Sequence, residues 1–211
     1  APLVLYVAIL CAYHGTALVK SLRYFFPAYP AFAVLAAALL ACAGGPGRPV
    51  LRRLAAGVVV LGTALSGLSF ASVYTRPHTR VAASRWIQAN VPAPARIANE
   101  AWDDGLPLPI PGLDAGRYAG PVLDLWVPED RAKVEALVST LSSADWIAVT
   151  SNRVYANVTR IPDVYPMAVA YYRALFSGEL GFRAEADFSS YPGIGPLRFP
   201  TDRAEEQFTV Y

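Results

Sequence analysis

Three long runs without a formal charge dominate the first part of the chain. They cover residues 2–19, 24–44 and 54–73. A transmembrane helix needs about 20 consecutive apolar residues to cross a hydrocarbon core of about 30 Å. The runs therefore predict three membrane-spanning helices within residues 1–74. Residues 75–211, which mix charged and apolar positions, are predicted to follow as a separate domain in water.

Charge is divided unevenly between the two ends of the chain. No Asp or Glu precedes Glu100, whereas nine Lys and Arg residues do. The remaining residues carry sixteen acids and nine bases, so the net charge of +2 hides a basic first part and an acidic second part. A basic part that is also apolar predicts contact with anionic lipid headgroups. Nucleic acid is excluded as a partner because the cations do not cluster on a polar, aromatic-rich surface.

Two cations, Lys20 and Arg23, lie between the first and second apolar runs, directly before Tyr24. At that place in the sequence they are expected at the membrane surface. Their long side chains could simply extend towards lipid headgroups. Alternatively, an ammonium group and a guanidinium fork could bind the phosphate of a lipid-linked substrate. The residues alone leave these two interpretations open.

The positive-inside rule predicts the orientation of the chain in the membrane. Arg48, Arg52 and Arg53 form a basic loop between the second and third runs, which places this loop in the cytoplasm. Lys20 and Arg23 then lie on the outer side, and so does the C-terminal domain. The arginines after the third run argue against this side, but a long domain translocates largely regardless of its charge.

Residues 75–211 alternate between helical and strand patterns, which is typical of an α/β fold. The tight sequence of strand 121–126, a helix opening at 128–130 and strand 146–150 predicts a βαβ unit with a parallel strand pair. A small α/β sandwich is therefore expected. The other predicted elements are a helix at 79–91, a strand at 96–102, a long loop at 105–120, a helix at 162–176 and strands at 182–188 and 207–211.

A self-contained catalytic set is missing from the sequence. The chain has no glycine-rich nucleotide loop, no nucleophile elbow and no Cys/His cluster with zinc spacing. We therefore predict no bound cofactor and no metal site, although a divalent cation is left open.

Two polar clusters follow predicted strands and are the candidates for contact with a ligand. Carboxylates at a strand end can act as a base or hold a divalent ion, although a hydrogen-bonded turn is the more common role. Polar residues after a strand can contact ligands in α/β sheets, although helix capping is more common. The first cluster is Glu100, Asp103 and Asp104, and the second is Ser151, Asn152 and Arg153.

Several stretches resemble a known enzyme family. Lys20-x-x-Arg23-Tyr24-Phe25-x-Pro27-x-x-Pro30 opens the second run, and further similar stretches cover residues 80–87, 99–107, 144–153, 171–182 and 206–211. Together they resemble the late membrane region and C-terminal extracytoplasmic domain of bacterial lipid-carrier-dependent glycosyltransferases. These enzymes are relatives of the protein O-mannosyltransferases and the aminoarabinose transferase, in the GT-C class.

The resemblance implies the C-terminal part of an inner-membrane enzyme that takes a sugar from a polyprenyl-phosphate donor. It implies that Lys20, Arg23 and Tyr24 bind the lipid phosphate. The two polar clusters are the candidates for facing the site or the acceptor, and the sequence leaves their approach to the site open. In that class the catalytic acid lies in the first extracytoplasmic loop, and no acid precedes Glu100 here. The chain is thus expected to lack the catalytic carboxylate and to be inactive alone. The alternative is a non-enzymatic, membrane-anchored α/β binding module; the sugar and the acceptor stay unidentified.

Overall fold

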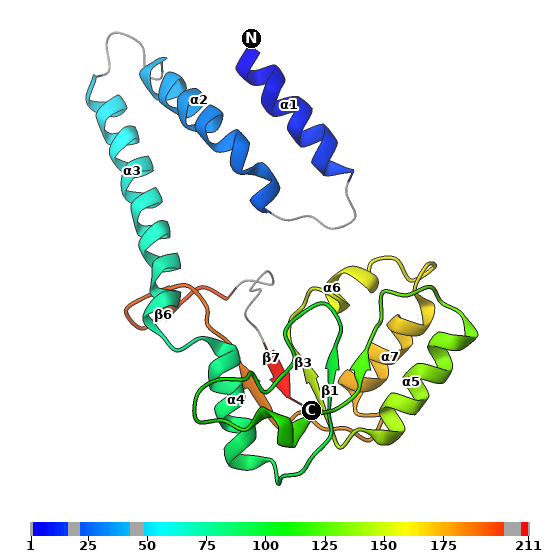
Figure 1. Cartoon of the computed structure of the whole chain (residues 1–211). Helices are drawn as coiled ribbons and strands as arrows, with labels where there is room; N and C mark the ends of the chain where they lie inside the picture. Colours follow the sequence, from blue (N-terminus) through cyan, green and yellow to red (C-terminus); the bar gives the residue numbers. More distant parts are fainter. Residues whose placement is uncertain (1, 17–21, 43–48, 201–207, 211) are drawn as a thin grey trace. The chain divides into compact units, whose positions relative to one another are not determined.

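The computed structural model describes residues 2–16, 22–42, 49–200 and 208–210 (Figure 1). It divides into two compact units, Ala1–Leu68 and Ser69–Tyr211. The first unit is helical and the second is a small α/β fold, so a helical part followed by an α/β part is confirmed. The division falls inside the third long helix, earlier than the predicted boundary between residues 74 and 75.

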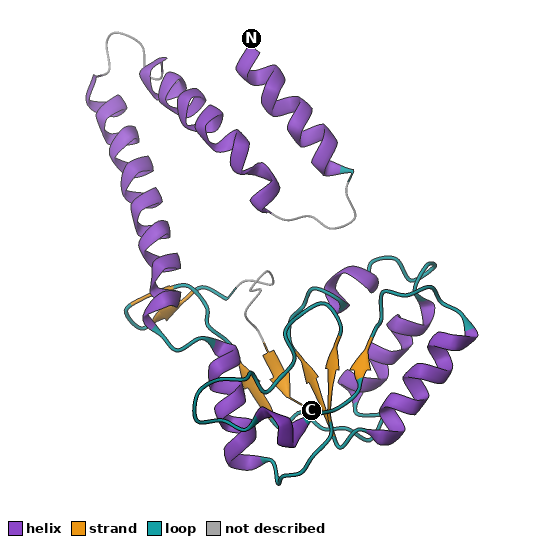
Figure 2. Cartoon of the chain, in the orientation of Figure 1, coloured by secondary structure: helices purple, strands orange, loops and turns teal. Residues whose placement is uncertain are grey.

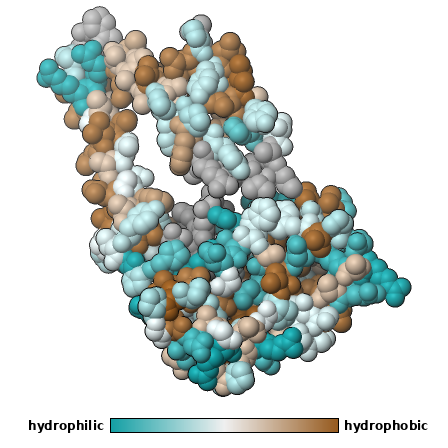
Figure 3. Space-filling model, in the orientation of Figure 1, coloured by the Kyte–Doolittle hydropathy of each residue, from teal (hydrophilic) through white to brown (hydrophobic). Residues whose placement is uncertain are grey.

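Two helical runs among the described residues are long and apolar enough to cross a membrane. One covers Tyr24–Cys42 and the other begins at Pro49. Only 11% and 6% of their most apolar windows are buried within the chain, and hydrophobic residues lie along their surfaces (Figure 3). Their elements are the short 3-10 helix η1 (Leu22–Ala28), helix α2 (Tyr29–Cys42) and helix α3 (Pro49–Ala71).

The first predicted span differs from the structure. Helix α1 (Pro2–Gly15) is apolar but has only 14 residues, and residues 17–21 lie outside the described part. The structure therefore contains two candidate membrane helices where three spans were predicted. Within the unit, the Tyr6 hydroxyl donates a hydrogen bond of 3.2 Å to the carbonyl of Pro27. This contact holds α1 against η1.

The predicted basic loop is shorter than expected. Arg52 and Arg53 lie in the first turn of α3, which begins at Pro49. Proline is favoured at the first helical position because its missing N–H has no intrahelical partner there and its φ angle suits a helix. The helix therefore starts before the third apolar run, and Arg48 lies outside the described residues.

The second unit is built on a five-stranded sheet with the strand order β2-β1-β3-β7-β4. Strands β2, β1 and β3 are parallel, and β7 pairs antiparallel with both β3 and β4. The predicted βαβ unit is thus partly wrong: β2 and β3 share a direction but are not neighbours, because β1 lies between them. The strands are β1 (Ile97–Glu100), β2 (Val122–Leu123), β3 (Trp146–Val149), β4 (Ala186–Phe188) and β7 (Phe208–Val210).

Helices cover both faces of this sheet (Figure 2). Alternate strand residues point to opposite faces: Ile97 and Ala148 belong to one buried cluster, and Ala98 and Ile147 belong to the other. Helix α4 (Thr79–Asn90) and the 3-10 turn η3 (Ala115–Tyr118) pack on the first face. The second face is covered by α5 (Arg131–Ser143), α6 (Tyr155–Val158) and α7 (Pro166–Ser177).

Local signals set the ends of these helices. Asp130 accepts a 2.9 Å hydrogen bond from the backbone N–H of Lys133 and so caps α5. Gly178 ends α7 with a left-handed φ of 82°, a conformation that glycine adopts without steric cost. On α7, Tyr172 is buried whereas Phe176 is 48% exposed.

A second, two-stranded sheet was not predicted. Strands β5 (Gly193–Ile194) and β6 (Leu197–Arg198) form an antiparallel hairpin. Its two-residue loop begins with Gly195, whose φ of +57° suits the first position of a type II′ turn. The hairpin contacts the 3-10 turn η2 (Ser72–Thr75), which directly follows α3.

Candidate functional site

The carboxyl ends of β1 and β3 form the candidate site. These strands are parallel neighbours, and the chain leaves them along different paths: from β1 into the long loop towards β2, and from β3 towards α6. In open α/β sheets, ligands bind in the crevice beyond the carboxyl ends of such strands. Both predicted polar clusters follow these two strands, so the sheet brings them to one edge.

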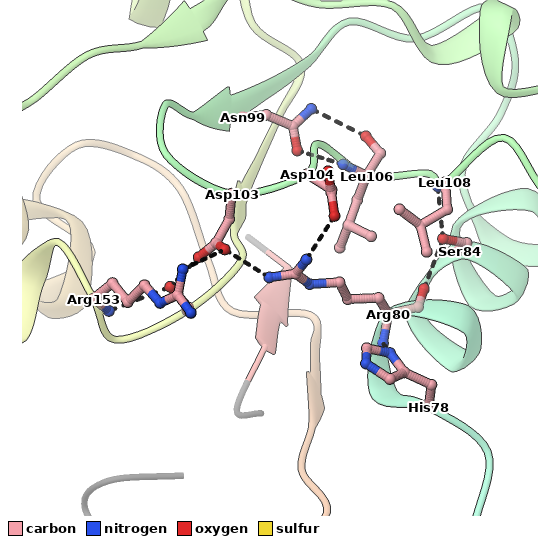
Figure 4. A network of polar contacts seen from close by, with 10 residues as sticks. His78, Arg80, Ser84, Asn99, Asp103, Asp104, Leu106, Leu108 and Arg153 are labelled. Carbon is pink, nitrogen blue, oxygen red and sulfur yellow. Dashed lines mark hydrogen bonds and ion pairs between the residues drawn. The ribbon is translucent and has the colours of Figure 1, made fainter. Parts of the chain in front are cut away.

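Asp103 lies at the centre of a polar network at this edge (Figure 4). Its carboxylate forms an ion pair of 2.8 Å with Arg80 and a longer one of 3.4 Å with Arg153. It also accepts a hydrogen bond from the hydroxyl of Ser151. The Asp103 side chain is only 8% exposed. One buried carboxylate thus joins α4 to the loops that follow β1 and β3.

Arg80 extends the network to Asp104. Its guanidinium contacts the Asp104 carboxylate at 3.0 Å, and Asp104 is 78% exposed where Arg80 is 16% exposed. The backbone N–H of Arg80 donates to Nδ1 of His78, which caps the start of α4. One turn further along α4, Ser84 accepts a hydrogen bond from the N–H of Leu108. These bonds fix the loop after β1 against α4.

Asn99 holds the same loop from the side of the sheet. Its amide oxygen accepts from the N–H of Leu106 at 2.7 Å, and its amide nitrogen donates to the carbonyl of Leu106 at 3.0 Å (Figure 4). Between these residues Trp102 has a φ of 98°, a left-handed conformation that is costly for a residue with a side chain. The Asn99 clasp and the ion pairs of Asp103 hold the loop in this conformation.

Glu100 points away from the network and into the core. Its side chain is 3% exposed and accepts a 2.7 Å hydrogen bond from the hydroxyl of Tyr172. Burial raises the pKa of Glu100 to about 8, with the negative charge of Asp103 adding to the increase and the Tyr172 hydrogen bond opposing it. Burial and the neighbouring carboxylate also raise the pKa of the Tyr172 hydroxyl. At neutral pH this buried pair therefore favours the neutral carboxylic acid.

The remaining predicted site residues are Asn152, at the sheet edge, and Lys20, Arg23 and Tyr24, in the first part of the chain. The backbone carbonyl of Asn152 accepts from the N–H of Ala156, at the start of α6. Lys20 lies outside the described residues, and Arg23 is placed only as part of the backbone of η1. The Tyr24 ring stacks on His14, with ring centroids 5.3 Å apart and an interplanar angle of 8°. The predicted site residues thus fall into two groups. Arg23 and Tyr24 belong to the helical unit, and the two polar clusters belong to the α/β unit.

Two residues of the sheet-edge site were not recognised as site residues from the sequence. Arg80 is one turn before Ser84 on α4, and both contact the loop after β1. Tyr172 lies on α7 and donates a hydrogen bond to the side chain of Glu100. A charged residue near the buried face of an amphipathic helix was a usable signal for Arg80. The pairing of Tyr172 with Glu100 had no signal in the local pattern.

The chemistry available at this edge is recognition through hydrogen bonds and charge. The network holds two guanidinium groups and two carboxylates, and Arg153, at 39% exposed, and Asp104 are its accessible ends. Within the described residues, His, Cys, Asp and Glu form no group of three or more that could hold a metal ion. Comparisons of the chain with protein-family models, curated proteins and solved structures found no match.

Proposed function

We propose that this chain is the C-terminal part of an integral-membrane glycosyltransferase of the GT-C class that uses a polyprenyl-phosphate sugar as donor. In this proposal the helical runs that contain α2 and α3 cross a bacterial inner membrane, and the α/β unit faces the extracytoplasmic side. The two long apolar helical runs support a membrane location. The basic residues at both ends of the second run support contact with anionic headgroups.

One observation carries the proposal. Four of the stretches that resemble the glycosyltransferases are far apart in the sequence, yet their side chains contact one another beside β1. Such contacts are expected if the resemblance reflects one folded site instead of four unrelated local patterns. Stretch 80–87 supplies Arg80, stretch 99–107 supplies Glu100 and Asp103, stretch 144–153 supplies Ser151 and Arg153, and stretch 171–182 supplies Tyr172.

The proposed reaction is an inverting transfer. The acceptor hydroxyl loses its proton to an Asp or Glu base outside these residues, and its oxygen bonds to the anomeric carbon. The bond from that carbon to the phosphate oxygen breaks, and the lipid phosphate keeps the electron pair. Lys20 and Arg23, with Tyr24 beside them, stabilise the charge that develops on the phosphate. The α/β unit covers the site or selects the acceptor.

A second candidate is a membrane-anchored binding module without catalysis. The way in which the sheet-edge carboxylates are used favours this alternative. Asp103 is engaged by two guanidinium groups and a hydroxyl, and Glu100 is buried against Tyr172. Carboxylates held in this way serve the structure of the unit and present few free oxygens to a substrate.

Binding of a polyprenyl phosphate to the whole chain in lipid nanodiscs distinguishes these functions. We expect binding to require the phosphate, so the matching polyprenol binds weakly. Each charge-assisted hydrogen bond contributes about 1.5–3 kcal/mol, so Lys20→Ala and Arg23→Ala should each weaken binding by roughly 10- to 100-fold. Arg52→Ala, at the other end of the second run, is the matched control and should bind normally. Equal affinity for the polyprenol and the polyprenyl phosphate contradicts the donor proposal and favours the membrane-anchored binding module.

A further inference from the structure

The β5–β6 hairpin is fastened to the residues that directly follow α3 (Figure 1). The N–H of Gly193 donates a 3.1 Å hydrogen bond to the hydroxyl oxygen of Ser72 in η2. The guanidinium of Arg76 donates to the carbonyl of Tyr191 and also reaches Ser72. The Ser72 hydroxyl in turn donates to the carbonyl of Ser69, in the last turn of α3. The hairpin is thus held at the point where the apolar helix ends.

Large apolar side chains are exposed throughout this region. In the hairpin, Leu197 is 63% exposed, and Ile194, directly opposite it in the register, is 39% exposed. Phe199 follows the hairpin at 46% exposure. At the end of α3, Phe70 and Tyr74 are 59% and 76% exposed and contact each other with ring centroids 6.1 Å apart. Single exposed apolar residues are common, whereas several of them on segments that contact one another are typical of an interaction surface.

The composition of these segments indicates which partner the surface fits. Neither residues 69–78 nor residues 189–200 contain an Asp or a Glu. Both contain an arginine: the guanidinium of Arg76 donates to the carbonyl of Tyr191, just before the hairpin, and that of Arg198 donates to the carbonyl of Gly195 in the hairpin loop. Exposed aromatic and aliphatic side chains with cations and no acids are typical of the layer between lipid headgroups and hydrocarbon.

We propose that the β5–β6 hairpin is a membrane-interface anchor, which inserts Ile194, Leu197 and Phe199 into the headgroup layer of the bilayer that α3 crosses. A helical turn rises 5.4 Å, and the polar layer outside the hydrocarbon is several ångströms thick on each side. A hairpin bonded to the first turn after α3 is therefore within reach of this layer. The inference rests on α3 crossing the membrane and is independent of glycosyl transfer.

Site-specific fluorescence on the whole chain tests the anchor. The exposed Cys11 and Cys42 are replaced by serine, and the polarity-sensitive dye NBD is attached to a single new cysteine. The chain is reconstituted into vesicles of phosphatidylcholine and phosphatidylglycerol, with and without lipids that carry a spin-label quencher near the headgroup. The test position is Leu197→Cys, the aqueous control is Val138→Cys on α5, and the membrane control is Val60→Cys on α3; the two controls are 57% and 67% exposed.

The anchor predicts blue-shifted NBD emission at position 197 and loss of most of that emission with the headgroup quencher. At position 138 the emission should match that of the dye in water and resist the quencher. A blue shift at 197 without quenching by lipid means that protein, from this chain or a second copy, covers the hairpin, and it overturns the proposal. Water-like emission at 197 overturns it as well. If the emission at position 60 is that of the dye in water, α3 is not in the bilayer and the anchor fails with it.

Discussion

The hydroxyl of Tyr172 donates a 2.7 Å hydrogen bond to Oε1 of Glu100, and both side chains are buried. Glu100 is the last residue of β1 and Tyr172 lies on α7, so the bond joins the sheet to a helix on one of its faces. All four tryptophans, Trp86, Trp102, Trp126 and Trp146, lie in the α/β unit. Their fluorescence therefore reports unfolding of this unit within the whole chain.

The stability of the α/β unit should fall as the pH rises through the range set by Glu100. Its pKa is about 8 in the folded protein against 4.5 in the reference state, so between these values the folded state binds more protons than the unfolded state. The stabilisation is complete below pH 4.5 and is lost as the pH rises towards 8. We expect the free energy of unfolding to decrease by up to about 5 kcal/mol over this range. Denaturant titrations at several pH values measure it.

Glu100→Gln is the matched variant for this pH dependence, because the amide keeps the shape of the side chain and cannot ionise. The decrease between pH 4.5 and 8 should become much smaller in this variant. An unchanged slope would mean that another group controls the pH dependence.

Tyr172→Phe should destabilise the unit and steepen its pH dependence. The variant leaves a buried carboxyl oxygen without its donor, which costs about 1–3 kcal/mol. The hydrogen bond lowers the pKa of Glu100, so its loss should raise that pKa further and make ionisation more costly. Tyr171→Phe, whose hydroxyl does not bond Glu100, is the control. In the double variant Glu100→Gln/Tyr172→Phe, the loss of the tyrosine hydroxyl should no longer change how the free energy of unfolding depends on pH.

Asp103→Asn should destabilise the unit far more than Asp104→Asn does. Asp103 is 8% exposed and pairs with Arg80, which is itself 16% exposed, so its removal takes the buried partner from this charge and leaves the exposed carboxylate of Asp104 beside it. Breaking such a pair typically costs about 3–5 kcal/mol. Asp104 is 78% exposed, and a surface pair contributes roughly 0–1 kcal/mol. Similar losses in both variants would contradict the central place of Asp103 in the network.

Gly120→Ala should disrupt the packing of the loop before β2 against β1. A β-carbon at Gly120 would lie 2.0 Å from the carbonyl oxygen of Ile97, and backbone atoms cannot yield as a flexible side chain can. We expect a loss of about 1–3 kcal/mol or more in the free energy of unfolding. Gly116→Ala is the control, because its nearest neighbour is 3.5 Å away. Equal stability of the two variants would show that the loop moves away from β1.

Residues close together in the sequence explain the parts of this fold that could be predicted. The uncharged runs indicated α2 and α3, and the helical patterns at 79–91, after 128–130 and at 162–176 indicated α4, α5 and α7. The strand patterns located β1 and β3 to within a few residues. The β5–β6 hairpin was missed because its strands have two residues each, too few for a period to be visible.

The sequence alone determined where the apolar helices lie and that an α/β unit follows them, because helix and strand periodicity and charge are properties of neighbouring residues. Only the tertiary structure decided that β1 lies between β2 and β3, that Asp103 joins Arg80 to Arg153, and that Glu100 turns inward to Tyr172. These contacts join residues far apart in the chain. They depend on strand order and on the faces that the helices cover, which no local pattern specifies.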